Sequence, residues 1–339
     1  MKYRLLSIFI ISLFTLIPAS AQNAPPIALT AIRAVAWHPG GNWIARAFQN
    51  GTVDVIDVSD GSTIFSFTDG TSEPARALAW QPDSETAFLA AAVGEMVYMW
   101  DMPNDSPMTT IAWGLPARSL DWTVQGGDKL AGASFTEFGP FPNRTSSDLS
   151  VWDPFSGNLI FDQGVGQLAR ASWGPDGDRL IVGSGLAIRT VDIITYEVEL
   201  LSPNSLELSA VQSVAWSPDG TRIASSGIFG QVSFWDGVTG QFISYTEETR
   251  LSVYWLAWSH DSSKLASASG DGTVRIWDGA TGQKLNEIQL HAGRVFAVDW
   301  SPDGTQIVYG TEDGTMGIVE ALPESPVFMP FSGDKQLLE

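Results

Sequence analysis

The chain has 339 residues and a formal net charge of −20, from 38 acidic and 18 basic residues. A surface this acidic repels nucleic acid and anionic membranes, so neither is expected as a partner. Cysteine is absent, which excludes disulfides, thiolate metal sites and cysteine nucleophiles.

The first 21 residues have the pattern of a secretory signal. Lys2 and Arg4 precede an apolar run over 5–17, and Ala19-Ser20-Ala21 is a small-x-small cleavage site. The apolar run is shorter than the roughly 20 residues of a membrane span. We therefore expect cleavage after Ala21 and an exported protein, periplasmic or extracellular and bacterial, with no membrane span afterwards. An uncleaved anchor is the alternative.

The rest of the chain is organised as a repeat of about 42 residues. An aromatic that ends a short apolar strand recurs with spacings of 43, 42, 51, 43, 42 and 42 residues, at Trp37, Trp80, Trp122, Trp173, Trp216, Trp258 and Trp300. Turn residues such as Pro218-Asp219-Gly220 usually follow it. Further strands are expected in each unit; in the sixth they cover 264–269 and 273–277, separated by an Asp-Gly turn. A fourth apolar segment closes each unit.

Seven units of four strands predict an all-β fold, a closed seven-bladed β-propeller of four-stranded antiparallel blades. The strings Ala-Trp-Ser-Pro-Asp-Gly at 215–220 and Asp-Gly-Thr-Val-Arg-Ile-Trp-Asp at 271–278 resemble WD40 repeats. The resemblance covers about residues 32–320. We expect a signal peptide over 1–21, an N-terminal segment over 22–31, the propeller over 32–332 and a tail over 333–339. The segment 326–331 is expected as the outer edge strand of the last blade.

The chain departs from the family pattern in two ways. The resemblance implies a buried Asp–His–Ser/Thr–Trp network in some blades, but no unit completes it: unit six has Ser267, Asp271 and Trp277 with Thr249 near the histidine position, and unit seven has His291 and Asp313 with Val319 at the tryptophan position. Blades are therefore expected to depend on apolar packing. The third unit carries an insertion over 135–147, either a binding loop or a tolerated surface insertion.

The sequence offers little for catalysis. His38, His260 and His291 are the only histidines and fall at turns or loops. No nucleophile elbow, zinc-protease motif or phosphate loop is present. The many aspartates recur at turn positions, where turn chemistry explains them better than calcium or carboxylate-pair catalysis. We therefore predict no catalytic residue, no metal and no cofactor.

One position stands out, four residues before each repeated tryptophan. The resemblance implies that it lies at the mouth of the central channel, with three arginines side by side and two aromatics facing them across it. Its seven occupants are Arg33, Arg76, Arg118, Ala169, Gln212, Tyr254 and Phe296. Arg294 is expected to add to the rim. In unit four Arg170 breaks the pattern, because it precedes Trp173 by three residues.

A guanidinium cluster suits a carboxylate, a phosphate or an acidic peptide, and aromatics suit apolar anchoring. The alternative is that these arginines pair with nearby acidic side chains and hold the blades together. The sequence therefore favours an exported, monomeric, non-catalytic scaffold that binds a protein or peptide, an acidic one included, at the channel mouth. A propeller hydrolase or lyase and a small-anion sensor are the alternatives.

Overall fold

The computed structural model describes residues 30–83, 85, 87–102, 104, 107–123, 127–134, 148–165, 168–201, 210–246, 251–322 and 328–330. The expected signal peptide, the insertion 135–147, Thr249 and the tail 333–339 lie outside the described residues. No helix in the described part of the chain has the length and apolar character to cross a membrane.

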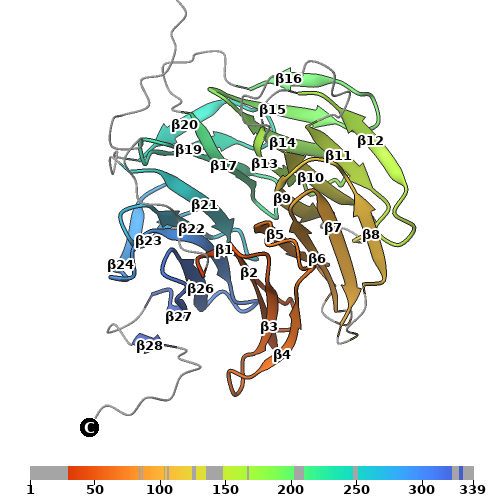
Figure 1. Cartoon of the computed structure of the whole chain (residues 1–339). Coiled ribbons are helices and arrows are strands. Elements are labelled where there is room, and N and C mark those ends of the chain that lie inside the picture. Colours follow the sequence, from red (N-terminus) through yellow and green to blue (C-terminus); the bar gives the residue numbers. More distant parts are fainter. Residues whose placement is uncertain are drawn as a thin grey trace, which may run out of the picture.

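The predicted fold is confirmed: seven four-stranded antiparallel sheets are arranged around a ring (Figure 1). The innermost strands are β1 (Ile32–Trp37), β5 (Ala75–Trp80), β9 (Ala117–Trp122), β13 (Leu168–Trp173), β17 (Val211–Trp216), β21 (Val253–Trp258) and β25 (Val295–Trp300). The second strands are β2 (Trp43–Phe48), β6 (Phe88–Val93), β10 (Leu130–Ser134), β14 (Arg179–Ser184), β18 (Arg222–Gly227), β22 (Lys264–Ser269) and β26 (Gln306–Thr311).

The third strands are mostly buried, and in blades one to six exposure is concentrated in the fourth strand. The third strands are β3 (Val53–Asp57), β7 (Met96–Asp101), β11 (Leu149–Trp152), β15 (Ala187–Asp192), β19 (Val232–Asp236), β23 (Thr273–Asp278) and β27 (Met316–Glu320). The fourth strands are β4 (Thr63–Phe67), β8 (Thr109–Ala112), β12 (Leu159–Gln163), β16 (Val198–Leu200), β20 (Phe242–Tyr245), β24 (Lys284–Gln289) and β28 (Phe328–Pro330).

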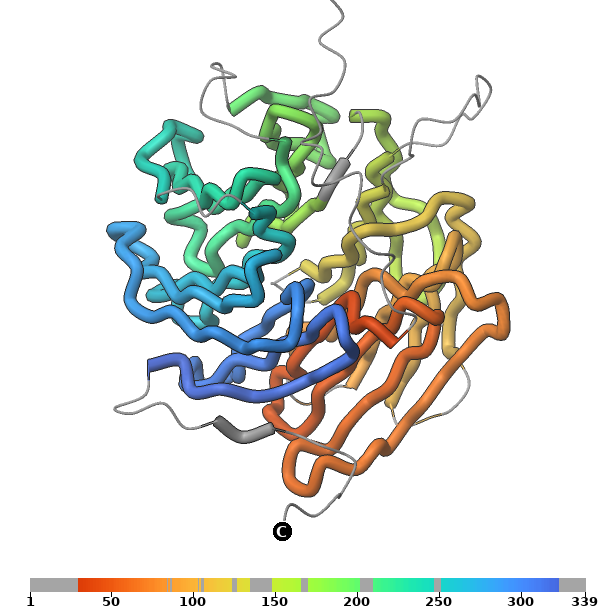
Figure 2. The backbone as a smooth tube through the Cα atoms, turned by 60° about the vertical axis from the view of Figure 1, so that its left-hand side comes forward, coloured from red at the N-terminus to blue at the C-terminus, as the bar shows by residue number. Residues whose placement is uncertain are grey.

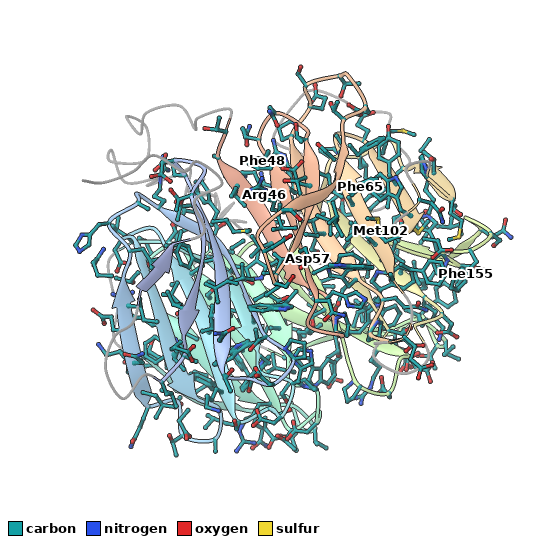
Figure 3. The ribbon with its side chains drawn as sticks, turned by 90° about the horizontal axis from the view of Figure 1, so that it is seen from below. Arg46, Phe48, Asp57, Phe65, Met102 and Phe155 are labelled. Carbon is teal, nitrogen blue, oxygen red and sulfur yellow. The ribbon has the colours of Figure 1, made fainter. Side chains whose placement is uncertain are left out.

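The hydrophobic core lies between blades. Each junction between neighbouring blades, the one between the last and the first included, holds its own cluster of buried apolar side chains. Phe65 of blade one and Met102 of blade two belong to one such cluster (Figure 3). A blade alone would expose both faces, so the ring is the unit that buries them.

The repeated tryptophans join the blades. Their indole Nε1–H groups donate to a backbone carbonyl of the preceding blade at 2.9–3.2 Å in five junctions, namely Trp80 to Ala36, Trp122 to Ala79, Trp173 to Asp121, Trp258 to Ala215 and Trp300 to Ala257. The indoles of Trp37 and Trp216 donate into their own turns instead. The 42-residue period is thus the spacing of interblade hydrogen bonds.

The ring closes where blade seven meets blade one (Figure 2). Asp299 Oδ2 accepts the Trp37 backbone N–H at 2.8 Å, and Ile32 and Val35 pack with Ala297 and Val308. The outer strand of blade seven is β28, which pairs with β27. This is the pairing expected for the segment 326–331.

The family's buried polar network survives only in part. In blade six the Trp277 indole donates to Ser267 Oγ at 2.9 Å, and in blade five the Trp235 indole donates to Ser225 Oγ at 3.0 Å. Asp271 accepts from Arg275 Nη2 at 2.7 Å. These two blades therefore have a polar contact within the blade in addition to their apolar packing.

Candidate functional site

A β-bulge places the predicted channel-mouth residues. In every blade the pairing of the first and second strands skips one residue of the first strand. The skipped residues are Arg33, Arg76, Arg118, Ala169, Gln212, Tyr254 and Phe296. A bulge bends its strand and re-aims the extra side chain. Seven equivalent bulges therefore present one residue from each blade at the same end of the ring.

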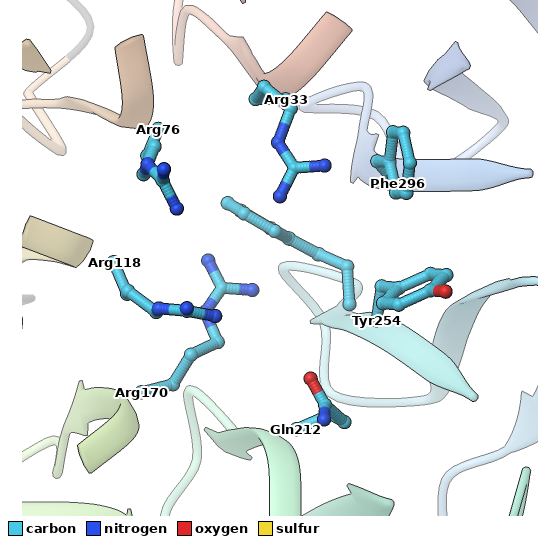
Figure 4. Close-up of a pocket in the computed structure, with 8 residues that line it drawn as sticks. Arg33, Arg76, Arg118, Arg170, Gln212, Tyr254 and Phe296 are labelled. Atoms are coloured by element: carbon cyan, nitrogen blue, oxygen red, sulfur yellow. The ribbon is translucent and has the colours of Figure 1, made fainter. Parts of the chain in front are cut away.

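Six of these seven residues line one pocket of about 120 Å³, which we call the arginine mouth; its lining is completed by Arg170 and Trp255. The six are Arg33, Arg76, Arg118, Gln212, Tyr254 and Phe296. Figure 4 shows the guanidinium groups of the four arginines around a common space. None of these described lining residues is acidic.

The sequence suggested that both aromatic residues face the arginines across the channel. The structure shows a different place for Phe296. Blade seven is the neighbour of blade one in the closed ring, so Phe296 lies beside Arg33, whose guanidinium carbon is 4.4 Å from the ring centroid. Tyr254 packs edge-to-face on Phe296 with ring centroids 5.2 Å apart. A cation–π contact of this kind holds a guanidinium in place and leaves its N–H groups available.

Arg33 presents buried donors without a hydrogen-bond partner at the mouth, namely its Nε and Nη1 atoms. Burial, followed by repulsion from Arg76 and Arg118, lowers its pKa to about 10. It is still protonated at neutral pH, so it presents unpaired, charged donors. Buried donors of this kind call for an acceptor.

Arg294 lies outside the pocket lining. Its Nε donates to Glu312 Oε2 at 2.9 Å, and hydrogen bonds with Glu312 raise the pKa of Arg294. Arg294 therefore fits the alternative expectation, in which an arginine pairs with a nearby acidic side chain. In contrast, no ion pair joins Arg33 or Arg76 to an acidic side chain in the part of the chain that the structure describes.

Sequence reasoning missed Arg170 and Trp255. Both lie three residues before a repeated tryptophan. In a regular strand, that residue and the residue four before the tryptophan point to opposite faces of the sheet. The bulge alters this geometry, and the Arg170 guanidinium carbon lies 3.1 Å from the Trp255 ring centroid. A signal did exist: the equivalent residues in the other blades are small, namely Ala34, Ala77, Ser119, Ser213 and Ala297.

The histidines do not gather at a site. His38 is buried and its ring contacts Trp43 and Trp80, while His260 borders the channel cavity. No group of three or more histidine, aspartate or glutamate side chains among the described residues has the arrangement of a metal site.

Comparison with known proteins agrees with this architecture. The profile of the WD domain, G-beta repeat matches residues 204–236, 242–278 and 282–318. The profile of the anaphase-promoting complex subunit 4 WD40 domain matches residues 24–125. The chain is a WD40-repeat β-propeller.

The curated relatives of this WD40 propeller are longer proteins. Periodic tryptophan protein 2 of Arabidopsis thaliana is 25% identical over 66% of this chain and 24% of its own length. Intraflagellar transport protein 80 homolog of Mus musculus is 24% identical over 60% of this chain and 24% of its own length. Ribosome biogenesis protein erb1 of Emericella nidulans is 32% identical over 23% of this chain and 10% of its own length. The chain thus spans about a quarter or less of these relatives.

Proposed function

We propose that this protein is an exported, monomeric, non-catalytic WD40 scaffold that binds an acidic protein or peptide at the arginine mouth. The carrying observation is the convergence of four arginines on one pocket whose lining, among the residues that the structure describes, contains no acidic side chain, in a protein of net charge −20. Basic residues are scarce in this chain, so their concentration at one mouth needs an explanation that general solubility does not provide.

The chemistry of the pocket supports an anionic ligand. Carboxylate oxygens would accept the unpaired donors of Arg33 and offset the mutual repulsion of the guanidinium groups. Tyr254 and Phe296 provide an apolar flank for the rest of the partner's side chain or backbone. The protein therefore offers both charge recognition and apolar anchoring at one mouth.

The comparisons support a partner-binding role. One matching profile describes the WD40 domain of a subunit of a complex, and one relative is named for ribosome biogenesis. Export rests on the signal-like pattern over 1–21. The relatives named above come from a plant, a fungus and a mouse, so a bacterial origin has no support from them. Terminal sequencing of the secreted protein tests export, with Gln22 expected as the first residue.

A sensor of small anions is the second candidate. The observation that favours it is the small size of the mouth, about 120 Å³. A thermal-shift screen of small carboxylates and phosphate beside acidic peptides separates the two. The scaffold predicts stabilisation by peptides at far lower concentrations than by any free anion.

The decisive test replaces Arg33, Arg76 and Arg118 together by alanine and measures binding to a panel of acidic peptides. A matched control replaces Arg179, Arg222 and Lys284, which are cations outside the mouth lining, and removes the same number of charges. We expect binding to fall at least tenfold in the mouth variant and to be retained in the control. Equal binding by both variants, with melting temperatures unchanged, would sink the proposal.

A further inference from the structure

Two side chains lie where the arginine mouth meets the channel behind it. The channel contains a cavity of about 460 Å³, and the mouth holds about 120 Å³. Arg170 and Trp255 are the two described residues that line both spaces. They come from blades four and six and meet across the intervening blade five. Together they form what we call the floor of the mouth.

The floor is a tight stack. The Arg170 guanidinium carbon lies 3.1 Å from the Trp255 ring centroid, and the Arg170 side chain is buried. The other five blades have alanine or serine at this position, so their side chains are too short to reach across the channel. A partner chain that enters the mouth therefore meets the Arg170–Trp255 stack on its way to the channel cavity.

Carboxylates lie behind the floor. Asp121 and Asp299 line the channel cavity, and each accepts a backbone N–H of the next blade at 2.8 Å, from Trp173 and Trp37 respectively. Both attract the Arg170 guanidinium electrostatically. They keep Arg170 charged and would repel an anion that moved deeper. The channel is thus cationic at the mouth and anionic beneath it.

From this arrangement we infer that the mouth receives a polypeptide C-terminus ending in an acidic residue, with Arg170 as a fourth anion-contacting residue and the Arg170–Trp255 stack as the floor. This inference rests on the proposed function and specifies its ligand. A side-chain stack that reaches across the channel favours a chain end or a side-chain tip over a threaded segment. A terminal aspartate brings two carboxylates in one residue, which suits four guanidinium groups better than the single charge of an internal acidic side chain.

The test measures binding of the full chain to five-residue peptides by fluorescence polarisation. One peptide ends in aspartate with a free carboxylate, a second is its C-terminal amide, and a third ends in asparagine with a free carboxylate. We expect the first to bind about tenfold or more tightly than either single-charge analogue, as each lost charge-assisted contact predicts. Inorganic phosphate serves as the competitor, because it is a dianion like the free aspartate terminus but carries no peptide.

Variants of the floor assign its two roles. Arg170→Gln is expected to weaken the free aspartate peptide about tenfold, while the exposed control Arg179→Gln leaves it unchanged. Arg170→Lys keeps a charge beside Asp121 and Asp299, so it tests the contact if the glutamine variant does not fold. Trp255→Ala opens the floor and should erase the preference for a chain end over an internal acidic side chain.

The outcomes separate this inference from the proposed function. If both Arg170 variants bind the free aspartate peptide as the wild type does, Arg170 only neutralises the carboxylates beneath it and the inference fails. If the triple replacement of Arg33, Arg76 and Arg118 still abolishes binding, the proposed function survives that failure. If the amidated peptide binds as well as the free acid, or phosphate displaces the peptide at lower concentration than the peptide itself binds, the assigned ligand is wrong.

Discussion

In blades five and six a serine hydroxyl accepts a hydrogen bond from a buried tryptophan indole, and blade two lacks this hydroxyl. The Trp235 and Trp277 indoles donate to Ser225 and Ser267, whereas Trp100 Nε1 is buried without a partner. The strand register places Ala91 at the position of these serines. We expect Ala91→Ser to raise the free energy of unfolding by about 1 kcal/mol, because it pairs a buried donor.

The matched control removes the hydroxyl from a blade that has it. Ser225→Ala leaves the Trp235 indole without its acceptor and should lower the free energy of unfolding by about 1–3 kcal/mol. Denaturant titration of both variants measures the two effects. A loss of stability in Ala91→Ser would show that blade two has no room for the hydroxyl.

A half-buried carboxyl in the channel makes stability depend on pH. Removal from water raises the pKa of Asp121 to about 6, so the folded state holds its proton more tightly than the unfolded chain. The stability that Asp121 contributes is full below its ordinary pKa near 4 and is lost as the pH rises through 6. Relative to the wild type, Asp121→Asn should therefore gain roughly 3 kcal/mol between pH 3 and pH 8.

An exposed aspartate gives the control with the opposite sign. Hydrogen bonds with Ser259 and Ser263 lower the pKa of Asp261 to about 2. Its contribution is present at neutral pH and is lost as the pH falls through that value. Relative to the wild type, Asp261→Asn should lose stability as the pH rises. Parallel curves for the two variants and the wild type would contradict both assignments.

At the scale of strands, the sequence predicts where elements lie better than where they bend. The in-phase tryptophans and Asp-Gly turns predict the second strand of blade six at its observed bounds, 264–269, and the third strand at 273–277, one residue short of its end at Asp278. The bulge at Tyr254 and its six equivalents has no sequence signature, because its occupants range from arginine to alanine. For that reason Arg170 appeared to break the pattern, although it lines the mouth.

Close packing around β10 leaves no room for a side chain at Gly132. A Cβ on Gly132 of β10 would lie 2.8 Å from the Trp152 ring and 2.9 Å from the Trp113 ring. Trp152 belongs to the neighbouring strand β11, and its ring packs edge-to-face on that of Trp113 with centroids 5.0 Å apart. Neither ring can move without disturbing the other, so Gly132→Ala should destabilise the propeller by about 1–3 kcal/mol. Gly164 has no atom within 4 Å of the same construction, so Gly164→Ala is the neutral control. Thermal melting of both variants decides, and equal melting temperatures would contradict the packing argument.

The whole ring shows which parts of the architecture follow from repetition. Seven equivalent units imply seven interblade cores, and the buried clusters follow the junctions one by one. Repetition does not specify the contact between the ends. Asp299 replaces the alanine found at this position in four blades, and its contact with Trp37 closes the ring. The placement of Arg33 beside Phe296 follows from that closure, which the alignment of units does not reveal.

The charge of the whole molecule opposes the charge of its mouth. At a distance an acidic peptide meets a protein of net charge −20, and only near the mouth does it meet four guanidinium groups. Salt screens the long-range repulsion first, because the Debye length falls from about 30 Å at 10 mM to about 8 Å at 150 mM. We therefore expect the association rate constant of an acidic peptide to rise about three- to tenfold over this range.

Stopped-flow kinetics with two charge-matched variants test this prediction. The mouth variant (Arg33, Arg76 and Arg118 to alanine) and the control variant (Arg179, Arg222 and Lys284 to alanine) each lose three positive charges, so they share one net charge. The control should keep the rise of the association rate with salt and bind tightly, because partly buried contacts in the mouth are screened less than the long-range field. An association rate that falls with salt in the wild type would mean that the mouth dominates the field even at long range.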